Sequence, residues 1–381
     1  MSLIILIDGL TAEGDPAPEK ICPILSRIGS GGAFGRVAFA SDQTPPELGA
    51  GIAAMLGLPF MAPEGGDVPL GYLAALGLGL NPEPKWSWCR LGFTHLRQEK
   101  DRLVFVSPQR TGLSPGEIDH LVGDLGGMFG DEGWQLHATP EKHLLLSHPE
   151  IHAVQTRDLA LLEGESMLDR LPKGVHGAKI NQLLIAGQLL LARHPINRQR
   201  AENGRLTVNT PWLWGVGPAS EGLDVVPPPT RGSFLTSDPV VAGLARVAGF
   251  APTLIDAETE TQPDRIESLL EACHNQSTIL HLRAPAILAR HGLHDKRREE
   301  ISRMSRAFLE PLAAHLAKRD DTLIISGHFT LSDQGHGVDG AVPWVAASGK
   351  NLTRSTLFKR RPDWAGGDAL DATTFGSRWL S

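Results

Sequence analysis

A small set of side chains in this chain could bind a metal ion. Asp8 directly follows the apolar run Leu3–Ile7. Three histidines lie in the C-terminal part of the chain: His291, His328 and His336. A carboxylate combined with imidazoles is a donor set that zinc accepts. Taken singly, each histidine is more often a surface or core residue, so the set has meaning only through the pattern in which it occurs.

These residues lie in or near short apolar runs that alternate with helical patterns, which predicts a mostly parallel sheet. The clearest predicted strands are Leu3–Ile7, Ser277–Leu282 and Leu323–Ser326. The clearest predicted helices are Gln182–Arg193, Asp238–Ala248 and Asp295–Lys318. Ligands of such sheets bind beyond the carboxyl ends of the strands. Asp8, at the end of the first predicted strand, therefore lies where a ligand site is expected.

A chain of 381 residues exceeds the usual size of a single core, which predicts a large α/β domain with an inserted lobe or two domains. Residues 98–157 contain their own predicted strands (Arg102–Ser107, Lys142–Ser147) and helix (Pro115–Gly126). We therefore expect an α+β cap at 98–157, inserted into a core formed by 1–97 and 158–381. Val225–Thr230 is rich in proline and predicts a surface connection.

Composition excludes several classes of protein. The formal net charge of −7 argues against a nucleic-acid-binding surface. No apolar run reaches the roughly 18 residues needed to cross a membrane, and the N-terminal apolar run lacks the basic flank of a signal peptide. Three scattered cysteines indicate reduced thiols and a cytoplasmic location.

Several segments resemble one known family. His194-Pro-Ile-Asn197 is followed by Asn209-Thr-Pro-Trp212-Leu-Trp-Gly-Val-Gly217. Together with Asp8 and the ending that contains His328 and His336, this order resembles the archaeal-type cofactor-independent phosphoglycerate mutases of the alkaline phosphatase superfamily. The resemblance covers most of the chain and is weakest in the expected cap. It implies an alkaline-phosphatase-like three-layer α/β core.

The resemblance also implies roles for individual residues. In that family a serine at a helix N-terminus accepts the phosphoryl group, and Asp and His side chains hold two divalent ions, typically manganese. The metal-binding positions that match in this chain are Asp8, His291, His328 and His336. Arg90 and Lys142 match cationic positions that would bind the anionic substrate.

Other positions depart from the family pattern. The family's nucleophilic serine corresponds to Leu48, which cannot accept a phosphoryl group. Two metal-binding aspartates correspond to Ala286 and Gly327. The remaining donors are one carboxylate and three imidazoles, too few for two ions that need oxygen ligands. They allow one divalent ion, zinc or manganese, and make a dinuclear site doubtful.

A displaced nucleophile is the remaining route to phosphoryl transfer. Thr44-Pro-Pro-Glu47 fits a capping box that begins the helix one turn earlier than the family's serine. Thr44 could attack phosphorus from there, although its capping role already explains it.

Three functional hypotheses follow. The first is a catalytically degenerate homologue that keeps the fold and binds a phosphorylated metabolite or a partner protein. The second is an enzyme of altered chemistry, such as a phosphate-ester hydrolase with one metal ion. The third is an active phosphoglycerate mutase that uses Thr44.

Overall fold

The chain forms two compact units. The computed structural model describes residues 2–12, 14–38, 50–60, 62–106, 108–257, 260–272, 276–290, 293–319, 321–327, 330–331, 337–338, 341–352 and 368–379. Residues 1–60 and 225–381 form the first unit, and residues 61–224 form the second. Among the described helices, none has the length and apolar character required to cross a membrane.

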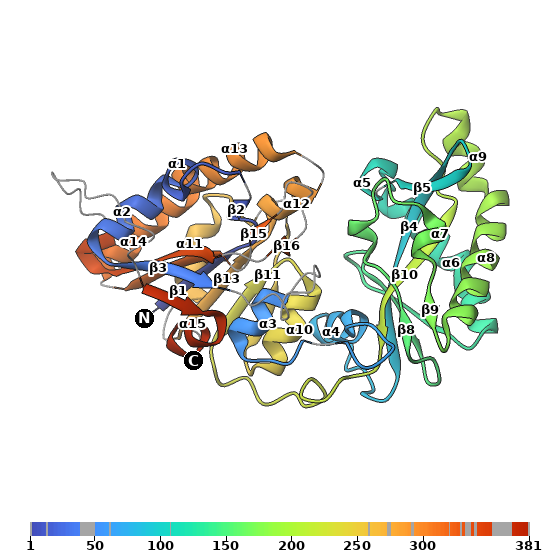
Figure 1. Cartoon of the computed structure of the whole chain (residues 1–381), viewed down its shortest axis with the longest axis horizontal. Helices are drawn as coiled ribbons and strands as arrows, with labels where there is room; N and C mark the ends of the chain where they lie inside the picture. Colours follow the sequence, from blue (N-terminus) through green and yellow to red (C-terminus); the bar gives the residue numbers. More distant parts are fainter. Residues whose placement is uncertain are drawn as a thin grey trace. The chain divides into compact units, whose positions relative to one another are not determined.

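The first unit is built on an eight-stranded sheet with the order β12-β11-β13-β1-β14-β17-β3-β18 (Figure 1). Its strands are β1 (Ser2–Ile7), β3 (Ala33–Ala38), β11 (Ser233–Thr236), β12 (Ala251–Leu254), β13 (Thr278–Leu282), β14 (Thr322–Gly327), β17 (Ala341–Ser348) and β18 (Asp368–Asp371). Strand β17 runs antiparallel to both of its neighbours, and the other pairs are parallel. The predicted mostly parallel sheet is confirmed, and its three predicted strands are β1, β13 and β14.

Strand β1 lies between β13 and β14, so Ile7 is paired with Leu282 on one side and with Gly327 on the other. Residues 3–7 are buried on both faces of the sheet. A parallel sheet covered on both faces requires such a continuous apolar run. The register brings the carboxyl ends of the three strands to one level, directly below Asp8.

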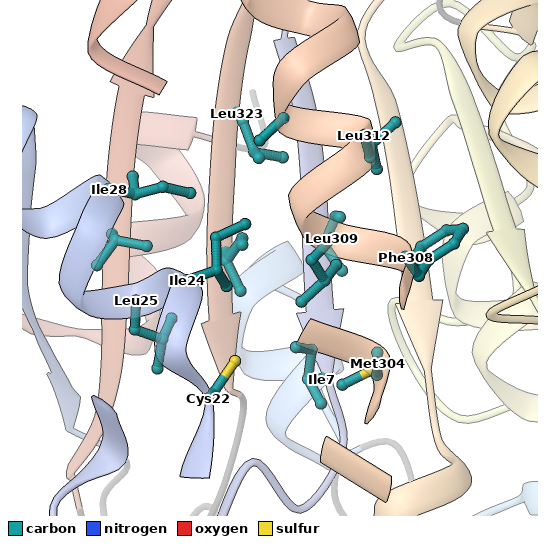
Figure 2. Packing of buried hydrophobic residues seen from close by; sticks show 14 of the residues in the cluster. Ile7, Cys22, Ile24, Leu25, Ile28, Met304, Phe308, Leu309, Leu312 and Leu323 are labelled. Carbon is teal, nitrogen blue, oxygen red and sulfur yellow. The ribbon is translucent and has the colours of Figure 1, made fainter. Parts of the chain in front are cut away.

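Helices cover both faces of this sheet, which gives the predicted three layers (Figure 1). One face carries α1 (Pro18–Ile21), α2 (Pro23–Gly31), α11 (Arg265–Ala272), α13 (His294–Met304) and α14 (Glu310–Arg319). The other carries α3 (Ala50–Leu56), α10 (Pro239–Val247) and α15 (Ala372–Trp379). On the first face, Figure 2 shows residues of α2, such as Ile24, packed with Ile7, Phe308 and Leu312. This packing buries the apolar side chains that define the core.

The predicted helix Asp295–Lys318 is interrupted in the structure. A π-helical segment, η3 (Ser305–Leu309), joins α13 to α14. The Ser305 hydroxyl accepts a hydrogen bond of 3.1 Å from the backbone N–H of Ile24, in the first turn of α2. Helix α13 begins at His294, one residue before the predicted start, so Asp295 lies in its first turn.

The second unit contains an antiparallel sheet with the order β10-β4-β7-β6, with β5 paired to β4. The bounds are β4 (Ser87–Glu99), β5 (Arg102–Val106), β6 (Gln135–Ala138), β7 (Leu144–His148) and β10 (Thr210–Gly217), with the small pair β8 (Val154–Gln155) and β9 (Lys173–Gly174). The helices are α4 (Leu70–Gly77), α5 (Pro108–Thr111), α6 (Pro115–Asp131), α7 (Met167–Arg170), α8 (Gly177–Arg193) and α9 (Pro195–Glu202), with a short 3-10 turn, η2 (Leu159–Leu161).

The second unit extends beyond the cap expected at 98–157. Residues 61–97 and 158–224, which the sequence assigned to the core, belong to this unit in the structure. The reason is strand pairing: residues 88–94 of β4, before the expected cap, pair with β10, after it. The expected internal pieces of the cap are present as β5, α6 and β7. Val225–Thr230 is exposed and begins where the chain re-enters the first unit.

Three short strands complete the first unit. They are β2 (Thr11–Ala12), β15 (Thr330–Leu331) and β16 (Gly337–Val338), in the order β16-β15-β2. Strand β2 belongs to the loop that follows Asp8. This pairing links that loop to the segment after β14.

Candidate functional site

Asp8 is fully buried at the carboxyl end of β1, as the sequence predicts for its position. Its backbone N–H donates a hydrogen bond of 2.7 Å to the carbonyl of Leu282, at the end of β13. The Nε2 atom of His281 lies 3.9 Å from Oδ2 of Asp8. A buried carboxylate next to a buried imidazole is a polar pair inside an otherwise apolar sheet.

His281 extends this polar region toward β11. Its Nδ1 atom lies 2.9 Å from the hydroxyl of Thr236, which is also buried. Thr236 in turn accepts a hydrogen bond of 3.1 Å from the backbone N–H of Asp238. His281, Thr236 and Asp238 are therefore linked by hydrogen bonds along the carboxyl edge of the sheet, and Asp8 lies 3.9 Å from His281 at one end of this polar network.

Asp238 combines two functions in this network. Its Oδ1 accepts a hydrogen bond of 2.8 Å from Val240 and caps helix α10, and its Oδ2 lies 2.9 Å from Nη1 of Arg283. The carboxylate is fully buried, and the Arg283 side chain is 18% exposed. The Arg283 side chain is thus a cation at the sheet edge that is still partly accessible to solvent. Asp238 was predicted only as the start of a helix.

Glu260 is a second buried acid that sequence reasoning did not identify. Its Oε1 accepts hydrogen bonds of 3.1 and 2.9 Å from the backbone N–H groups of Arg283 and Ala284, at the start of helix α12 (Ala284–Arg290). Ser237 donates to its Oε2. Burial raises the pKa of Glu260 even though these hydrogen bonds favour the ionised form. No local sequence pattern marks Glu260, because its partners are distant in the chain.

The loop after Asp8 is held by a buried arginine. Arg297 of α13 donates to the carbonyl of Gly9 at 2.9 Å and reaches both oxygens of Asp15 at 2.5 Å. Asp15 also accepts a hydrogen bond of 2.7 Å from the backbone N–H of Ala12. Arg297 is completely buried. Its Nη2 atom contacts both Asp15 oxygens and its Nη1 atom the Gly9 carbonyl, so this one side chain fixes the loop beyond Asp8.

Two positions that resemblance assigns to metal-binding aspartates carry no donor. Ala286 is 1% exposed and forms a small apolar cluster with Ala12 and Ala289. Gly327 ends β14, where the hydroxyl of Ser326 donates to its carbonyl at 2.8 Å. The side chain of Ala286 therefore packs against other alanines and offers no metal ligand.

The other predicted ligands and the nucleophile region lie outside the described residues. These positions are Thr44, Leu48, His291, His328 and His336. Asp8 is the one predicted ligand within the described ranges. There, no group of three or more His, Cys, Asp or Glu side chains is arranged to hold a metal ion.

Arg90 and Lys142, the predicted anion-binding residues, both belong to the second unit. The guanidinium of Arg90 lies over the ring of Trp214, 5.1 Å from its centroid. Lys142 follows β6 in a turn and pairs with Asp119 at 2.5 Å. The Lys142 charge is therefore already neutralised by a neighbour. The cation–π contact leaves the Arg90 fork able to accept an anion.

Comparisons with known proteins agree with this architecture. No family model matches the chain. A probable 2,3-bisphosphoglycerate-independent phosphoglycerate mutase of Geobacter sulfurreducens is 23% identical over 91% of this chain and 90% of its own length. The 2,3-bisphosphoglycerate-independent phosphoglycerate mutase of Methanosarcina mazei is 21% identical over 80% of this chain and 77% of its own.

Two solved structures share the fold. A protein from Pyrococcus horikoshii aligns with a TM-score of 0.66 at 15% identity, covering 100% of this chain and 96% of that one. A cofactor-independent phosphoglycerate mutase from Thermoplasma acidophilum aligns with a TM-score of 0.51 at 17% identity, covering all of both chains. This chain is a divergent relative of the 2,3-bisphosphoglycerate-independent phosphoglycerate mutases.

The segment that most resembles these phosphoglycerate mutases has a structural role in this relative. His194 caps helix α9 by accepting from Ile196 at 3.3 Å, and its Nε2 lies 2.8 Å from Asp124. Asn197 donates to two backbone carbonyls and accepts from the N–H of Val208 at 2.7 Å. The hydrogen bonds of these side chains lie within the second unit and join α8, α9 and the segment that leads into β10.

Arg200 continues this structural motif. It is 1% exposed, pairs with Glu117 at 2.7 Å and donates to the carbonyls of Leu206 and Thr111. Glu117 also completes the capping box of α6 with Ser114. Burial opposes the ionisation of Glu117, but hydrogen bonds from Ser114 and Arg200 outweigh it and lower its pKa to about 2. The motif therefore ties α9 to α6.

Proposed function

We propose that this chain is a phosphoglycerate-mutase-like protein that has lost phosphoryl transfer and retains binding of a small phosphorylated metabolite. The observation that carries the proposal is the apolar cluster around Ala286. A two-metal mechanism needs carboxylates that clamp the attacking and leaving oxygens. An alanine packed against Ala12 and Ala289 cannot supply one, and Leu48 cannot accept a phosphoryl group.

The remaining edge supports ligand binding more than catalysis. Asp8 is next to an imidazole, and Asp238 and Glu260 are engaged by Arg283 and by the start of α12. A single divalent ion, zinc or manganese, on Asp8 and the histidines outside the described residues remains compatible with these donors. Such an ion would polarise a phosphate oxygen. Arg90, in the second unit, is by itself a cation to which a phosphate could bind.

The loss of catalysis is tested by assaying the purified chain with 3-phosphoglycerate and manganese. We expect no formation of 2-phosphoglycerate above a blank without protein. The triple variant Leu48→Ser, Ala286→Asp, Gly327→Asp should bind more manganese than the unmodified chain, as measured by elemental analysis after dialysis. Manganese-dependent turnover that disappears in Thr44→Ala would contradict the proposal and support the displaced nucleophile.

Ligand binding is tested by calorimetric titration with 3-phosphoglycerate. Arg90→Ala should weaken binding by about tenfold or more, since it removes an unneutralised guanidinium. Lys142→Ala should change the affinity much less, because Asp119 already neutralises that ammonium. Equal effects of the two variants would exclude Arg90 as the principal anion contact.

A further inference from the structure

A pocket of about 610 Å³ lies on the first unit, lined by residues of α1, α13 and η3. This volume is within the range of sites that bind small organic molecules. Asp8, His281, Asp238 and Glu260 are not among its lining residues. It is therefore a separate candidate site.

Cations outnumber acids in the lining of this pocket. Four cations line it, Lys20, Arg298, Arg303 and Arg306, together with one acid, Glu299. The whole chain has a net charge of −7. Arg298 and Arg303 are also paired with acids outside the lining. Lys20 and Arg306 therefore carry the positive charge that could attract an anion, and arginine forks match the oxygens of phosphate groups.

Two of these cations are available to a ligand. Arg306 donates to the carbonyl and hydroxyl of Ser302, at 3.3 and 3.2 Å, and to no carboxylate within the described part of the chain. Lys20 likewise has no ion pair among the described residues. Both side chains are exposed. An anion could bind them without first displacing an internal carboxylate.

The rest of the lining is suited to an organic group. Pro16, Ile21 and Ala307 present apolar surface beside the cations. Inorganic phosphate would leave this surface uncovered. A phosphorylated organic molecule would cover it and bring its phosphates to Lys20 and Arg306.

The other two arginines connect the pocket to the two loops that shape the sheet edge. Arg298 lies 3.5 Å from Asp15, the residue that also holds Arg297 in the loop after Asp8. Arg303 donates at 2.7 Å to Thr261, adjacent to Glu260. Each arginine also pairs at 2.5 Å with an acid of its own helix, Asp295 or Glu300.

We propose that this pocket is an effector site for a phosphorylated organic anion, coupled to the sheet edge through Arg298–Asp15 and Arg303–Thr261. An anion that engages these arginines redistributes their hydrogen bonds between the ligand and the two loops. The coupling is reciprocal, so a ligand at the sheet edge changes the affinity of the pocket by the same factor.

Binding is tested on the full chain by calorimetric titration with ATP, with tripolyphosphate and adenosine as its two halves. We expect saturable binding of ATP that is tighter than that of either half. The double variant Lys20→Ala, Arg306→Ala should weaken ATP binding by about tenfold or more. The control Lys296→Ala, Lys318→Ala removes two exposed cations of the same unit outside the pocket and should leave the affinity unchanged. Equal affinities of the two double variants, or no saturable heat, would overturn the proposal.

The coupling is tested by hydrogen exchange with and without saturating ATP. The amides of Arg283 and Ala284, which donate to Glu260, lie outside the pocket. We expect their exchange rates to change on ATP binding in the unmodified chain and in the Lys296, Lys318 control. Changes confined to α1, α13 and η3 would refute the coupling. This readout is independent of phosphoglycerate binding or turnover, so it distinguishes failure here from failure of the proposed function.

Discussion

The structural motif of the second unit and the sheet edge of the first differ in how far their side chains match the phosphoglycerate mutase pattern. His194 and Asn197 resemble the His-Pro-x-Asn pattern of the phosphoglycerate mutases, and Arg200 follows them on helix α9. The hydrogen bonds of all three side chains are made within their own unit. At the sheet edge the resemblance matches Asp8 to a metal-binding acid and assigns Ala286 and Gly327 to positions of two others. Under the proposed function, the side chains that hold the fold together have been kept and those that would bind two metal ions and a phosphoryl group have been lost.

This difference explains how a chain can match a family in its structural residues although residues needed for catalysis are replaced. A buried hydrogen-bonding residue such as Asn197 cannot be replaced without leaving backbone groups unpaired, which costs stability directly. Replacing a metal-binding carboxylate has the opposite effect on stability. Its replacement by alanine removes charge repulsion from the fold and costs only activity. A chain released from catalysis therefore keeps the first kind of residue and can lose the second.

The largest expected effect on stability is at Arg200, because its side chain is buried and makes several internal hydrogen bonds. Arg200→Met removes a buried cation and leaves Glu117 and two carbonyls with fewer partners, so the free energy of unfolding should fall by about 3–5 kcal/mol. Urea unfolding followed by tryptophan fluorescence measures it, because five of the eight tryptophans lie in residues 61–224.

Arg205→Met is the matched control. Arg205 contacts the same Glu117 carboxylate at 3.4 Å, but its side chain is 46% exposed. Its replacement should change stability by no more than about 1 kcal/mol. If both variants unfold alike, burial of Arg200 does not explain the retention of the motif.

A smaller, pH-dependent effect is expected at Asp67, which binds the backbone N–H and hydroxyl of Thr156 in the second unit. Burial raises the pKa of Asp67 to about 6 despite these hydrogen bonds. The folded state thus holds this proton more tightly than the unfolded chain. The contribution of protonated Asp67 to the free energy of unfolding is therefore fully present below pH 3.8. It is lost as the pH rises through about 6.

Asp67→Asn removes this titration and keeps an oxygen acceptor for Thr156. Between pH 4 and pH 7 the unmodified chain should lose on the order of 2–3 kcal/mol relative to the variant. Urea unfolding at several pH values measures the difference and cancels other groups, including Glu117. Parallel pH profiles of the two proteins would show that Asp67 does not titrate in this range.

The smallest effect is expected at the sheet edge, at Glu260. Glu260→Ala leaves the buried N–H groups of Arg283 and Ala284 without their acceptor and should destabilise the first unit by about 1–3 kcal/mol. Glu260→Gln keeps an acceptor and should cost less than about 1 kcal/mol. Native-state hydrogen exchange of β1 reports the stability of this unit. A stabilising Glu260→Ala would instead indicate that the carboxylate is retained for a ligand at the expense of the fold.

Sequence by itself determined the parallel strands β1, β13 and β14, the helix that begins at Asp238 and the place of Asp8 at the end of β1, because these features depend on local apolar runs and on caps. The assignment of Ala286 and Gly327 to positions of metal-binding aspartates rests on the resemblance and stays a prediction. The roles of Thr44, His291, His328 and His336 remain predictions.

Tertiary structure decided the rest, since it depends on contacts between distant segments. The pairing of β4 with β10 moved the unit boundary to residues 61 and 224. Glu260 became a cap for α12 only because the fold brings it to Arg283, and Arg298 reaches Asp15 across 283 positions of sequence. Hydrogen bonds and ion pairs act over a few ångströms in space, and no local pattern reveals which remote residues the packing of the core will bring within that distance.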